Sequence, residues 1–511
     1  MAKLSIIIPV YNMKEQERQC LLSIRQTVHL PYEIIVVDDG SSADERISDA
    51  GTADNVRILH SDEHRGFSHA VNMGIQASVG EVVLFLHADT RLAPHTVEDM
   101  LDALIADSEL GAVSAVAART YERAQLIPDT TYQSWESFAE VAGEIRERGA
   151  SPHPEILTEM FALMARRDAV NAAGPLDEQY QVPALAAYDY TVRMTRAGYG
   201  IASLPSVYVH HVESVHDQNQ EEYDRQREKE RESFHVKWNV SLDYSFYARI
   251  DLFPLMNLTR EGLRVLEIGC ACGATLREIK MHNPTAELYG VELNEHAAAI
   301  AAPFAEILSM NVENLDPAEI PERFNYIIMG DVIEHLLDPW TALANMRELL
   351  APGGAVIASI PNVAHISNVY NLLSGYWSYQ DMGLLDRTHY RFFTRCEIIK
   401  LFENAQLSVE QIQSKQISFP EGGAAIRDEL LSLKNISVDP LDLDTYQWLV
   451  CGRRAFIFFH IFLWHRAIIC CIMRRIMAFL MGGMRCGAMC WSSCVKQAAI
   501  YRERRWRSGS G

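Results

Sequence analysis

The sequence is short of positive charge and of cysteine over most of its length. It has 46 Lys and Arg against 67 Asp and Glu, for a formal charge of −21, which argues against a nucleic-acid-binding protein because such proteins present a basic surface. Four of the ten cysteines lie before residue 451, and they are scattered, as expected in a reducing compartment without a disulfide framework. The chain also lacks a basic and then apolar leader, so we expect no signal peptide and a cytoplasmic location.

What the sequence does have is enough apolar residues for more than one core. With 48% apolar residues in a chain of 511, we expect two or three domains. Short β-branched runs alternate with helix-like segments near the start and again after residue 263, which predicts parallel, doubly wound sheets. A run of mixed charge between them is typical of a solvated linker helix. The predicted fold class is therefore α/β with two doubly wound domains, and the expected boundaries are 1–215 and 246–415 for the domains, 216–245 for the linker, 416–450 for an extension and 451–511 for a tail.

Acidic side chains follow the strands of the first region. Asp38 and Asp39 end a buried strand, at the edge where ligands bind in open α/β sheets; they can contact a nucleoside or cap the turn that follows. His87 and Asp89 are two residues apart in an extended segment, so they face the same way. Asp89 suits an oxygen-ligated divalent ion beside a diphosphate, with a strand-end cap as the alternative. Asp189 opens a helix, where an acid can simply be a favourable charge.

Together these segments resemble an inverting family 2 glycosyltransferase with a GT-A fold, over about residues 3–215. The matching stretches are LSIIIPVYN, IIVVDDGSS, GFSHAVNMGIQASVGEVVLFLHADT, FALMARRDAV and AYDYTVRMTRAGYG. The resemblance implies a nucleotide-sugar donor, a glycan or glycoconjugate acceptor, and Mg²⁺ or Mn²⁺. It implies nucleotide contacts from Pro9, Tyr11, Asp38 and Asp39, metal contacts from Asp89, His87 and His210 or His211, and a catalytic base at Asp189.

The sequence departs from that family at two positions. His87 stands where the metal motif usually has its first Asp, and Tyr188 stands where the base motif usually has Glu. The remaining acids still suit sugar transfer, because a carboxylate must accept the proton of the attacking hydroxyl. A divalent ion neutralises the charge of the departing nucleoside diphosphate. One base acting in a single displacement would invert the anomeric centre.

The stretch VLEIGCACGATL, 265–276, predicts a strand, a turn of small residues and a helix. Small residues let the backbone approach a nucleotide-like ligand, and Gly269 and Gly273 hold the outer positions of the turn. Ala271 holds the middle position, where a methyl group is tolerated if φ is negative. Glu292 ends the next strand, where an acid can accept hydrogen bonds from both hydroxyls of a ribose. A dinucleotide site has the same spacing.

The segments from about 246 to 415 resemble a class I S-adenosylmethionine-dependent methyltransferase with a Rossmann-like fold. GDVIEHLLDP at 330–339 and LLAPGGAVIASIPN at 349–362 carry this resemblance together with the small-residue turn. It implies S-adenosylmethionine as the cofactor, bound by Glu267, Gly269, Gly273, Glu292, Asn311 and Asp331.

The methyl acceptor is expected near residues 361–394, a segment similar to one in methyltransferases linked to bacterial surface-glycan synthesis. A neutral sugar hydroxyl needs a base, and His389, oriented by Asp386, is the candidate. The alternative is that LDRTHYRFFT is a structural turn, with His389 in an ordinary hydrogen bond.

The tail differs in composition from the rest of the chain. Residues 455–483 are strongly apolar but are interrupted by His460, His465 and Arg466, which favours an amphipathic membrane anchor over a span. Residues 451–511 hold eleven Lys and Arg against one Glu, together with six cysteines. A disordered or foreign tail, such as one from a shifted reading frame, is an equal alternative, and a cysteine metal site is a minor one.

The two resemblances predict a bifunctional transferase, with the membrane contact of 455–483 making it peripheral on the cytoplasmic face of a bacterial membrane. The first domain would transfer a sugar, and the second would methylate a glycan hydroxyl in surface polysaccharide or glycoprotein synthesis. Three alternatives stay open at this point: a first domain that only binds glycan or nucleotide, a methyl acceptor that is a quinone or other small molecule, and a structural membrane scaffold without a cofactor.

Overall fold

The computed structural model describes most of the chain before Ala455. The described residues are 4–46, 55–118, 125–126, 132–211, 220–419, 422–435 and 438–454. The predictions for the apolar segment 455–483, and for the tail beyond Arg454 generally, lie outside the described residues. Within these ranges no helix is both long and apolar enough to cross a membrane.

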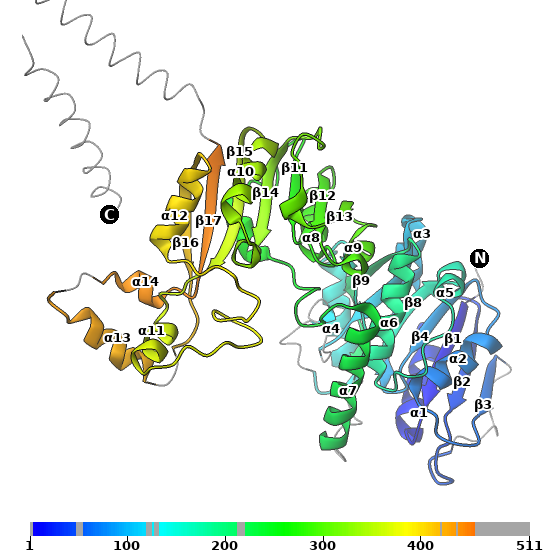
Figure 1. The fold of residues 1–511 in the computed structure, drawn as a ribbon. Helices are drawn as coiled ribbons and strands as arrows, with labels where there is room; N and C mark the ends of the chain where they lie inside the picture. The colour runs from blue at the N-terminus through cyan, green and yellow to red at the C-terminus, as the bar shows by residue number, and fades with distance from the viewer. Residues whose placement is uncertain are drawn as a thin grey trace, which may run out of the picture. The chain divides into compact units, whose positions relative to one another are not determined.

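The first domain is built on a mixed, eight-stranded sheet with β4 and β8 at its centre (Figure 1). In spatial order its strands are β3 (Val56–His60), β2 (Tyr32–Asp38), β1 (Leu4–Val10), β4 (Val82–Leu86), β8 (Ala162–Arg166), β6 (Leu110–Val116), β9 (Gly200–Tyr208) and β7 (His153–Glu155). A separate pair is formed by β5 (Thr90–Arg91) and β10 (His210–His211). The helices are α1 (Lys14–Thr27), α2 (Phe67–Ala77), α3 (Thr96–Ala106), α4 (Trp135–Glu147), α5 (Arg167–Ala173), α6 (Pro183–Arg196) and α7 (Gln220–Trp238).

Both faces of this sheet are buried, as its apolar strands predict. Ile7 of β1 lies in one core cluster with residues of α2, α5 and α6, whereas Ile6 and Ile8 lie in another with residues of α1 and α3. Helices on both faces explain why β1 and β2 are almost continuously apolar. The doubly wound arrangement is confirmed, but the sheet is not wholly parallel, because β8 runs antiparallel to both β4 and β6.

Helix α7, which falls in the predicted linker, packs on the first domain. Phe234 and Trp238 are buried in the same core cluster as Tyr190 of α6. Glu230 is 2% exposed, and its carboxylate accepts the backbone N–H groups of Gln181 and Val182 at 2.9 and 3.0 Å. Although most of α7 is charged, one narrow face of the helix packs on the first domain through apolar residues and a buried carboxylate. The sequence pattern did not predict this packing.

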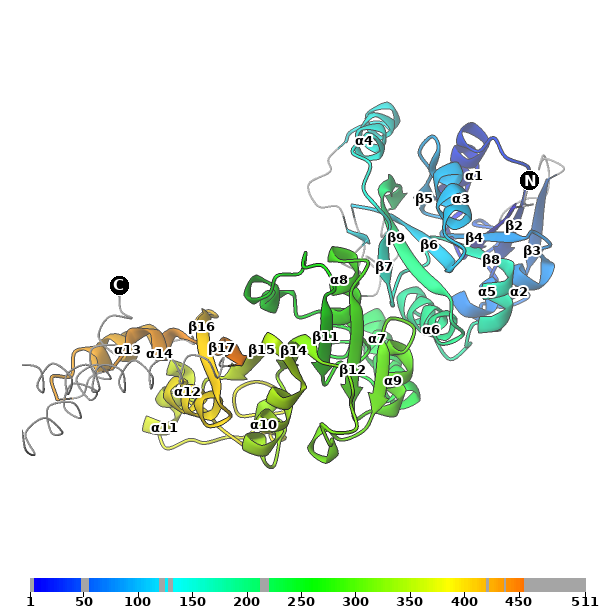
Figure 2. The same ribbon diagram turned by 90° about the horizontal axis from the view of Figure 1, so that it is seen from above.

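The second domain has a seven-stranded sheet in the part of the chain that is described. In spatial order its strands are β13 (Glu306–Ser309), β12 (Glu287–Glu292), β11 (Arg264–Ile268), β14 (Phe324–Gly330), β15 (Leu350–Pro361), β17 (Gln447–Arg454) and β16 (Leu407–Lys415). Its helices are η3 (Ile250–Leu255), α8 (Ala274–His282), α9 (Glu295–Ala301), η4 (Val312–Asn314), η5 (Ile333–His335), α10 (Pro339–Leu349), α11 (Ile366–Leu373), α12 (Arg395–Asn404), α13 (Gly423–Leu431) and α14 (Pro440–Asp444). Helices α8 and α9 lie beside β11 and β12 (Figure 2).

The second sheet continues past the boundary expected at residue 415. Strand β17 pairs antiparallel with both β15 and β16, so the predicted extension and the first four residues of the predicted tail complete this domain. Trp448 and Val450 of β17 are fully buried in the core. Because β17 lies between β15 and β16, its removal would leave the backbone of both neighbouring strands unpaired and expose the core beneath them.

Candidate active sites

The first cleft, of about 390 Å³, opens where β1, β2 and β4 end. This is the carboxyl edge at which open α/β sheets bind ligands. Six of the residues singled out from the sequence line it: Pro9, Tyr11, Asp39, His87, Asp89 and His211. Asp38, Asp189 and His210 do not.

Asp38 and Asp39 are adjacent but have different surroundings. Asp39 lines the cleft, and its carboxylate accepts the backbone N–H of Gly66 at 2.7 Å. Asp38 is fully buried behind it and accepts the N–H of Ser41 at 3.0 Å. Burial alone would raise the pKa of Asp38, but hydrogen bonds from Ser41 and His60 hold that pKa below its ordinary value. Asp38 is thus the turn cap, and Asp39 is the residue that can meet a nucleoside.

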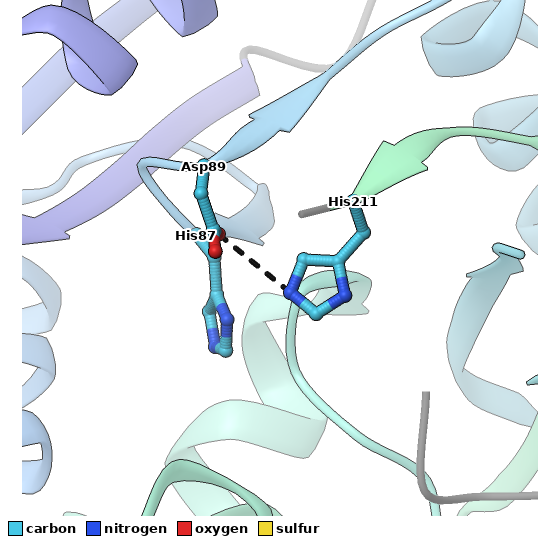
Figure 3. Close-up of side chains that lie close together, drawn as sticks. All are labelled: His87, Asp89 and His211. Carbon is cyan, nitrogen blue, oxygen red and sulfur yellow. Dashed lines mark ion pairs between the residues drawn. The ribbon is translucent and has the colours of Figure 1, made fainter. Parts of the chain in front are cut away.

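Three side chains at this cleft form a candidate metal site (Figure 3). One possible ligand atom from each of His87, Asp89 and His211 lies within 4.8 Å of the others. The Nε2 atom of His211 is 3.6 Å from Asp89 Oδ1. Two imidazoles and a carboxylate are a suitable set for Mn²⁺ and for other divalent transition metals.

His87 has the properties of a ligand rather than of a charged group. Its Nε2 atom is buried without a hydrogen-bond partner among the described residues. Burial, with a smaller contribution from His211, lowers the pKa of His87 to about 3. A neutral imidazole with an unshared nitrogen is what metal binding requires, so the donor set fits a divalent ion. His87 thus offers a possible ligand atom at the position where the metal motif usually has Asp.

His210 is not part of this cluster, contrary to its predicted role in metal binding. Successive side chains of a strand point to opposite faces, and β10 contains both His210 and His211. The ring of His211 stacks on Phe161 beside the cleft, whereas His210 contacts the hydroxyl of Tyr132. His211 is therefore the histidine that reaches Asp89.

Asp189 does not reach the cleft, contrary to the base role predicted for it. It is fully buried, and its carboxylate accepts hydrogen bonds from Trp238 Nε1 and Arg193 Nε, each at 3.0 Å. Lys237 Nζ lies 2.6 Å from Asp189 Oδ1. The part of α6 that does line the cleft is its first turn, which carries no acid. Asp189 lies more than one helical turn beyond the α6 residues that line the cleft, and its contacts with Trp238 and Lys237 join α6 to α7.

Sequence patterns missed several residues of the first cleft. Glu159 is a third carboxylate in its lining, and Tyr223 and Gln226 reach it from α7. Glu159 precedes β8 in a segment without a recognisable motif. Tyr223 and Gln226 lie in the charged run, where the sequence carries no sign of a ligand site.

The second cleft, of about 360 Å³, lies at the carboxyl ends of β11, β12 and β14. Four predicted cofactor residues line it: Gly269, Glu292, Asn311 and Asp331. Glu292 accepts the N–H of Ala271 at 2.8 Å and that of Asn294 at 2.8 Å, which fixes its carboxylate at the end of β12. This is the position from which an acid can bind a ribose.

The small-residue turn is tighter than its sequence indicated. Ala271 has φ of +47°, so the condition of a negative φ, under which a methyl group is tolerated at this position, is not met. Gly273 has φ of +83°, and a Cβ there would lie 3.0 Å from Ala301 Cβ. Gly273 is therefore needed for the packing of α8 rather than for direct lining of the cleft. Glu267 also lies outside the lining; burial raises its pKa to about 8, against a smaller lowering by Thr275.

Arg249, which the sequence gave no reason to select, contacts a residue of this site. Its guanidinium donates to Asp331 Oδ2 at 2.5 Å and to Ser359 Oγ at 2.8 Å. Asp331 itself has φ of +55° at the end of β14. The ion pair thus fixes a sharply turned acid at the wall of the cofactor cleft.

His389 and Asp386 lie close together, but not as a base and its orienting acid. The Asp386 carboxylate accepts the N–H and the hydroxyl of Thr388 at 2.8 and 2.7 Å. His389 Nδ1 instead lies 3.2 Å from the carbonyl oxygen of Leu384. Asp386 shapes the turn, which corrects the predicted pairing.

The chain thus has two α/β domains, each with a ligand-sized cleft at the carboxyl edge of its sheet. Residues 5–171 match the model of Glycosyl transferase family 2, and residues 243–412 match that of a Methyltransferase domain. The chain therefore carries a family 2 glycosyltransferase domain followed by a methyltransferase domain, which confirms both resemblances.

Curated relatives match one domain at a time. A teichoic acid poly(glycerol phosphate) polymerase of Staphylococcus epidermidis is 31% identical over 133 residues, 25% of this chain and 18% of that protein. Glycosyltransferase AglE of Haloferax volcanii is 30% identical over 207 residues, 39% of this chain and 62% of that protein. A ubiquinone biosynthesis O-methyltransferase of Cereibacter sphaeroides is 30% identical over 152 residues, 29% of this chain and 61% of that protein. The chain spans less than two thirds of each relative.

Proposed function

We propose that this protein transfers a sugar from a nucleotide-sugar donor to a glycan or glycoconjugate, and methylates a hydroxyl group with S-adenosylmethionine. The His87–Asp89–His211 cluster carries the first half of the proposal, because it lies in the same cleft as Asp39. A diphosphate held by the metal and a nucleoside at Asp39 would both fit that cleft. When bound, the metal would neutralise charge on the departing diphosphate.

Glu159 is our candidate for the base that Asp189 cannot supply. It is 5% exposed and lines the cleft together with Asp39 and Asp89. The other two cleft carboxylates have the nucleoside and the metal as their proposed partners. Transfer by one base in a single displacement would invert the anomeric centre, and this stereochemistry is part of the proposal.

The test is metal-dependent release of nucleoside diphosphate from a panel of nucleotide sugars by the full chain. We expect release with Mn²⁺ or Mg²⁺, its loss with EDTA, and a fall of about 100-fold in Asp89→Asn. Asp102→Asn is the matched control, since Asp102 is exposed on α3. No release at any donor concentration would instead make the first domain a binding module.

Methyl transfer is supported by the second cleft, where Gly269, Glu292 and Asp331 surround a space of nucleoside size. Exposed aromatic side chains, among them Tyr376, Tyr379 and Tyr390, lie in the segment after α11 and offer a broad surface for an acceptor. We favour a glycan hydroxyl as acceptor, in surface polysaccharide or glycoprotein synthesis on the cytoplasmic side of the membrane. The likeness of the first domain to a teichoic acid polymerase supports that setting.

A second candidate acceptor is a quinone-type small molecule. The 30% identity of the second domain to a ubiquinone biosynthesis O-methyltransferase favours it. Radiolabelled methyl donor would distinguish the two, since label in polymeric glycan supports the first acceptor and label in the lipid extract supports the second.

A further inference from the structure

A second cluster of ligand-type side chains lies beside the methyltransferase cleft. Glu334 and His335 come from η5, and His389 comes from the turn before α12. One possible ligand atom of each lies within 4.8 Å of the others. The two imidazole rings are 4.7 Å apart between centroids and nearly perpendicular.

Glu334 is the unusual member of this cluster. It is 1% exposed, and neither carboxylate oxygen has a hydrogen-bond partner among the described residues. Burial raises its pKa well above the ordinary value, and the nearby charge of Asp331 adds to that effect. A buried carboxyl group without a partner is costly, and a bound cation would supply the missing partner.

Both histidines are oriented as metal ligands are. His335 Nδ1 lies 3.2 Å from the carbonyl oxygen of Thr388, and His389 Nδ1 lies 3.2 Å from that of Leu384. Donation from each Nδ1–H to a carbonyl leaves the lone pair on Nε2, which is the usual arrangement for a ligating imidazole.

The surroundings fix this arrangement and place it at the second cleft. Asp386 holds the turn through Thr388, and the N–H groups of Tyr390 and Arg391 donate to the Glu334 carbonyl oxygen at 2.9 and 3.1 Å. His335 and Tyr390 line the same cleft as Glu292. The cluster therefore borders the space proposed for S-adenosylmethionine.

We propose that Glu334, His335 and His389 bind a divalent transition-metal ion that holds the acceptor hydroxyl for methylation. Two nitrogens and one carboxylate suit Zn²⁺ or Mn²⁺ and leave at least one coordination position for an acceptor oxygen. The bound hydroxyl releases its proton to water, its oxygen forms the new bond to the methyl carbon, and the sulfonium S–CH₃ bond breaks to leave S-adenosylhomocysteine. This role for the metal rests on the methyl transfer proposed above.

The test measures Zn²⁺ bound to the full chain by equilibrium dialysis and elemental analysis. All proteins carry Asp89→Asn, so that the first cluster does not contribute. We expect about one equivalent in this background and a loss of affinity of about tenfold or more in Glu334→Gln and in His389→Gln. His282→Gln, an exposed histidine of α8, is the matched control and should bind as the background does. Equal binding in all four proteins, or none in the background, overturns the proposed site.

Calorimetry with S-adenosylhomocysteine separates this site from the function on which it rests. Binding of S-adenosylhomocysteine without any Zn²⁺ binding would overturn the metal site and leave the methyltransferase proposal intact. Zn²⁺ binding that depends on Glu334 and His389, without S-adenosylhomocysteine binding, would support the site and contradict the methyltransferase proposal. Circular dichroism of each variant verifies that its fold is retained.

Discussion

The two clefts differ in how directly the sequence motif indicates which side chain lines the cleft. In the methyltransferase cleft, Gly269, Glu292 and Asp331 each follow a strand and reach the ligand space directly. In the glycosyltransferase cleft, Asp39 reaches it and the adjacent Asp38 does not. A motif therefore identifies the edge of the sheet at which the site lies. Which of two adjacent side chains lines the cleft depends on the local backbone geometry.

The largest expected effect concerns the base of the glycosyltransferase cleft. Glu159→Gln should lower sugar transfer by about 1000-fold, because it removes the proposed proton acceptor while keeping the size of the side chain. Methyl transfer by the same protein, measured with a labelled methyl donor, is the internal control. Retention of wild-type sugar transfer in Glu159→Gln would eliminate this residue as the base.

Asp189→Asn tests whether a buried acid outside the cleft contributes to stability rather than to catalysis. It should reduce the free energy of unfolding by about 3 kcal/mol, since Lys237 and Arg193 would lose their anionic partner. Urea denaturation measures this change, with Asp102→Asn as the exposed control. A variant as stable as wild type but inactive in sugar transfer would show that Asp189 acts in catalysis after all.

His210 and His211 are adjacent on β10, but only His211 lies in the proposed metal site. His211→Gln should lower metal-dependent sugar transfer by about 100-fold, because it removes a proposed ligand. His210→Gln should leave it within about threefold of wild type, as its ring contacts Tyr132 instead. Similar losses in both variants would contradict the separation of the two side chains.

Glu267 gives the methyltransferase domain a predicted pH dependence. Its pKa rises in the folded state from 4.5 to about 8, chiefly through burial, so the folded state holds a proton that the unfolded state releases. The stability that this proton contributes is complete below about pH 4.5 and is lost as the pH rises through 8. Denaturation between pH 5 and 8 should therefore show stability falling by up to about 1.4 kcal/mol per pH unit, and a flatter profile in Glu267→Gln.

The smallest effect is expected at the small-residue turn. Ala271→Gly should raise the free energy of unfolding by about 1 kcal/mol or less, because a φ of +47° strains alanine but not glycine. Affinity for S-adenosylhomocysteine should stay unchanged, since the N–H of residue 271 still donates to Glu292. A destabilised Ala271→Gly protein would show that the methyl group contributes more through packing than it costs through strain.

Much of the fold was predictable, but the domain limits were not. Runs such as those of β1 and β11 are apolar on both sides, which identifies doubly wound sheets. Strand β17, however, is separated from its partners by helices and loops, and its pairing with β15 and β16 depends on the rest of the domain. Helix α7 likewise has an ordinary charged pattern, and its burial of Phe234 and Trp238 is decided by the surface of α6.

The sequence alone determined that the chain has two doubly wound domains and at which edge of each sheet a ligand site is expected, because strand periodicity and small-residue turns are local properties of the chain. Tertiary structure alone decided that His211 rather than His210 reaches Asp89, that Asp189 is buried behind α7, and that Glu334 meets His389. Those contacts join segments that are far apart in the chain. Their geometry depends on how the helices and strands pack, and the spacing of residues in the sequence does not specify that packing.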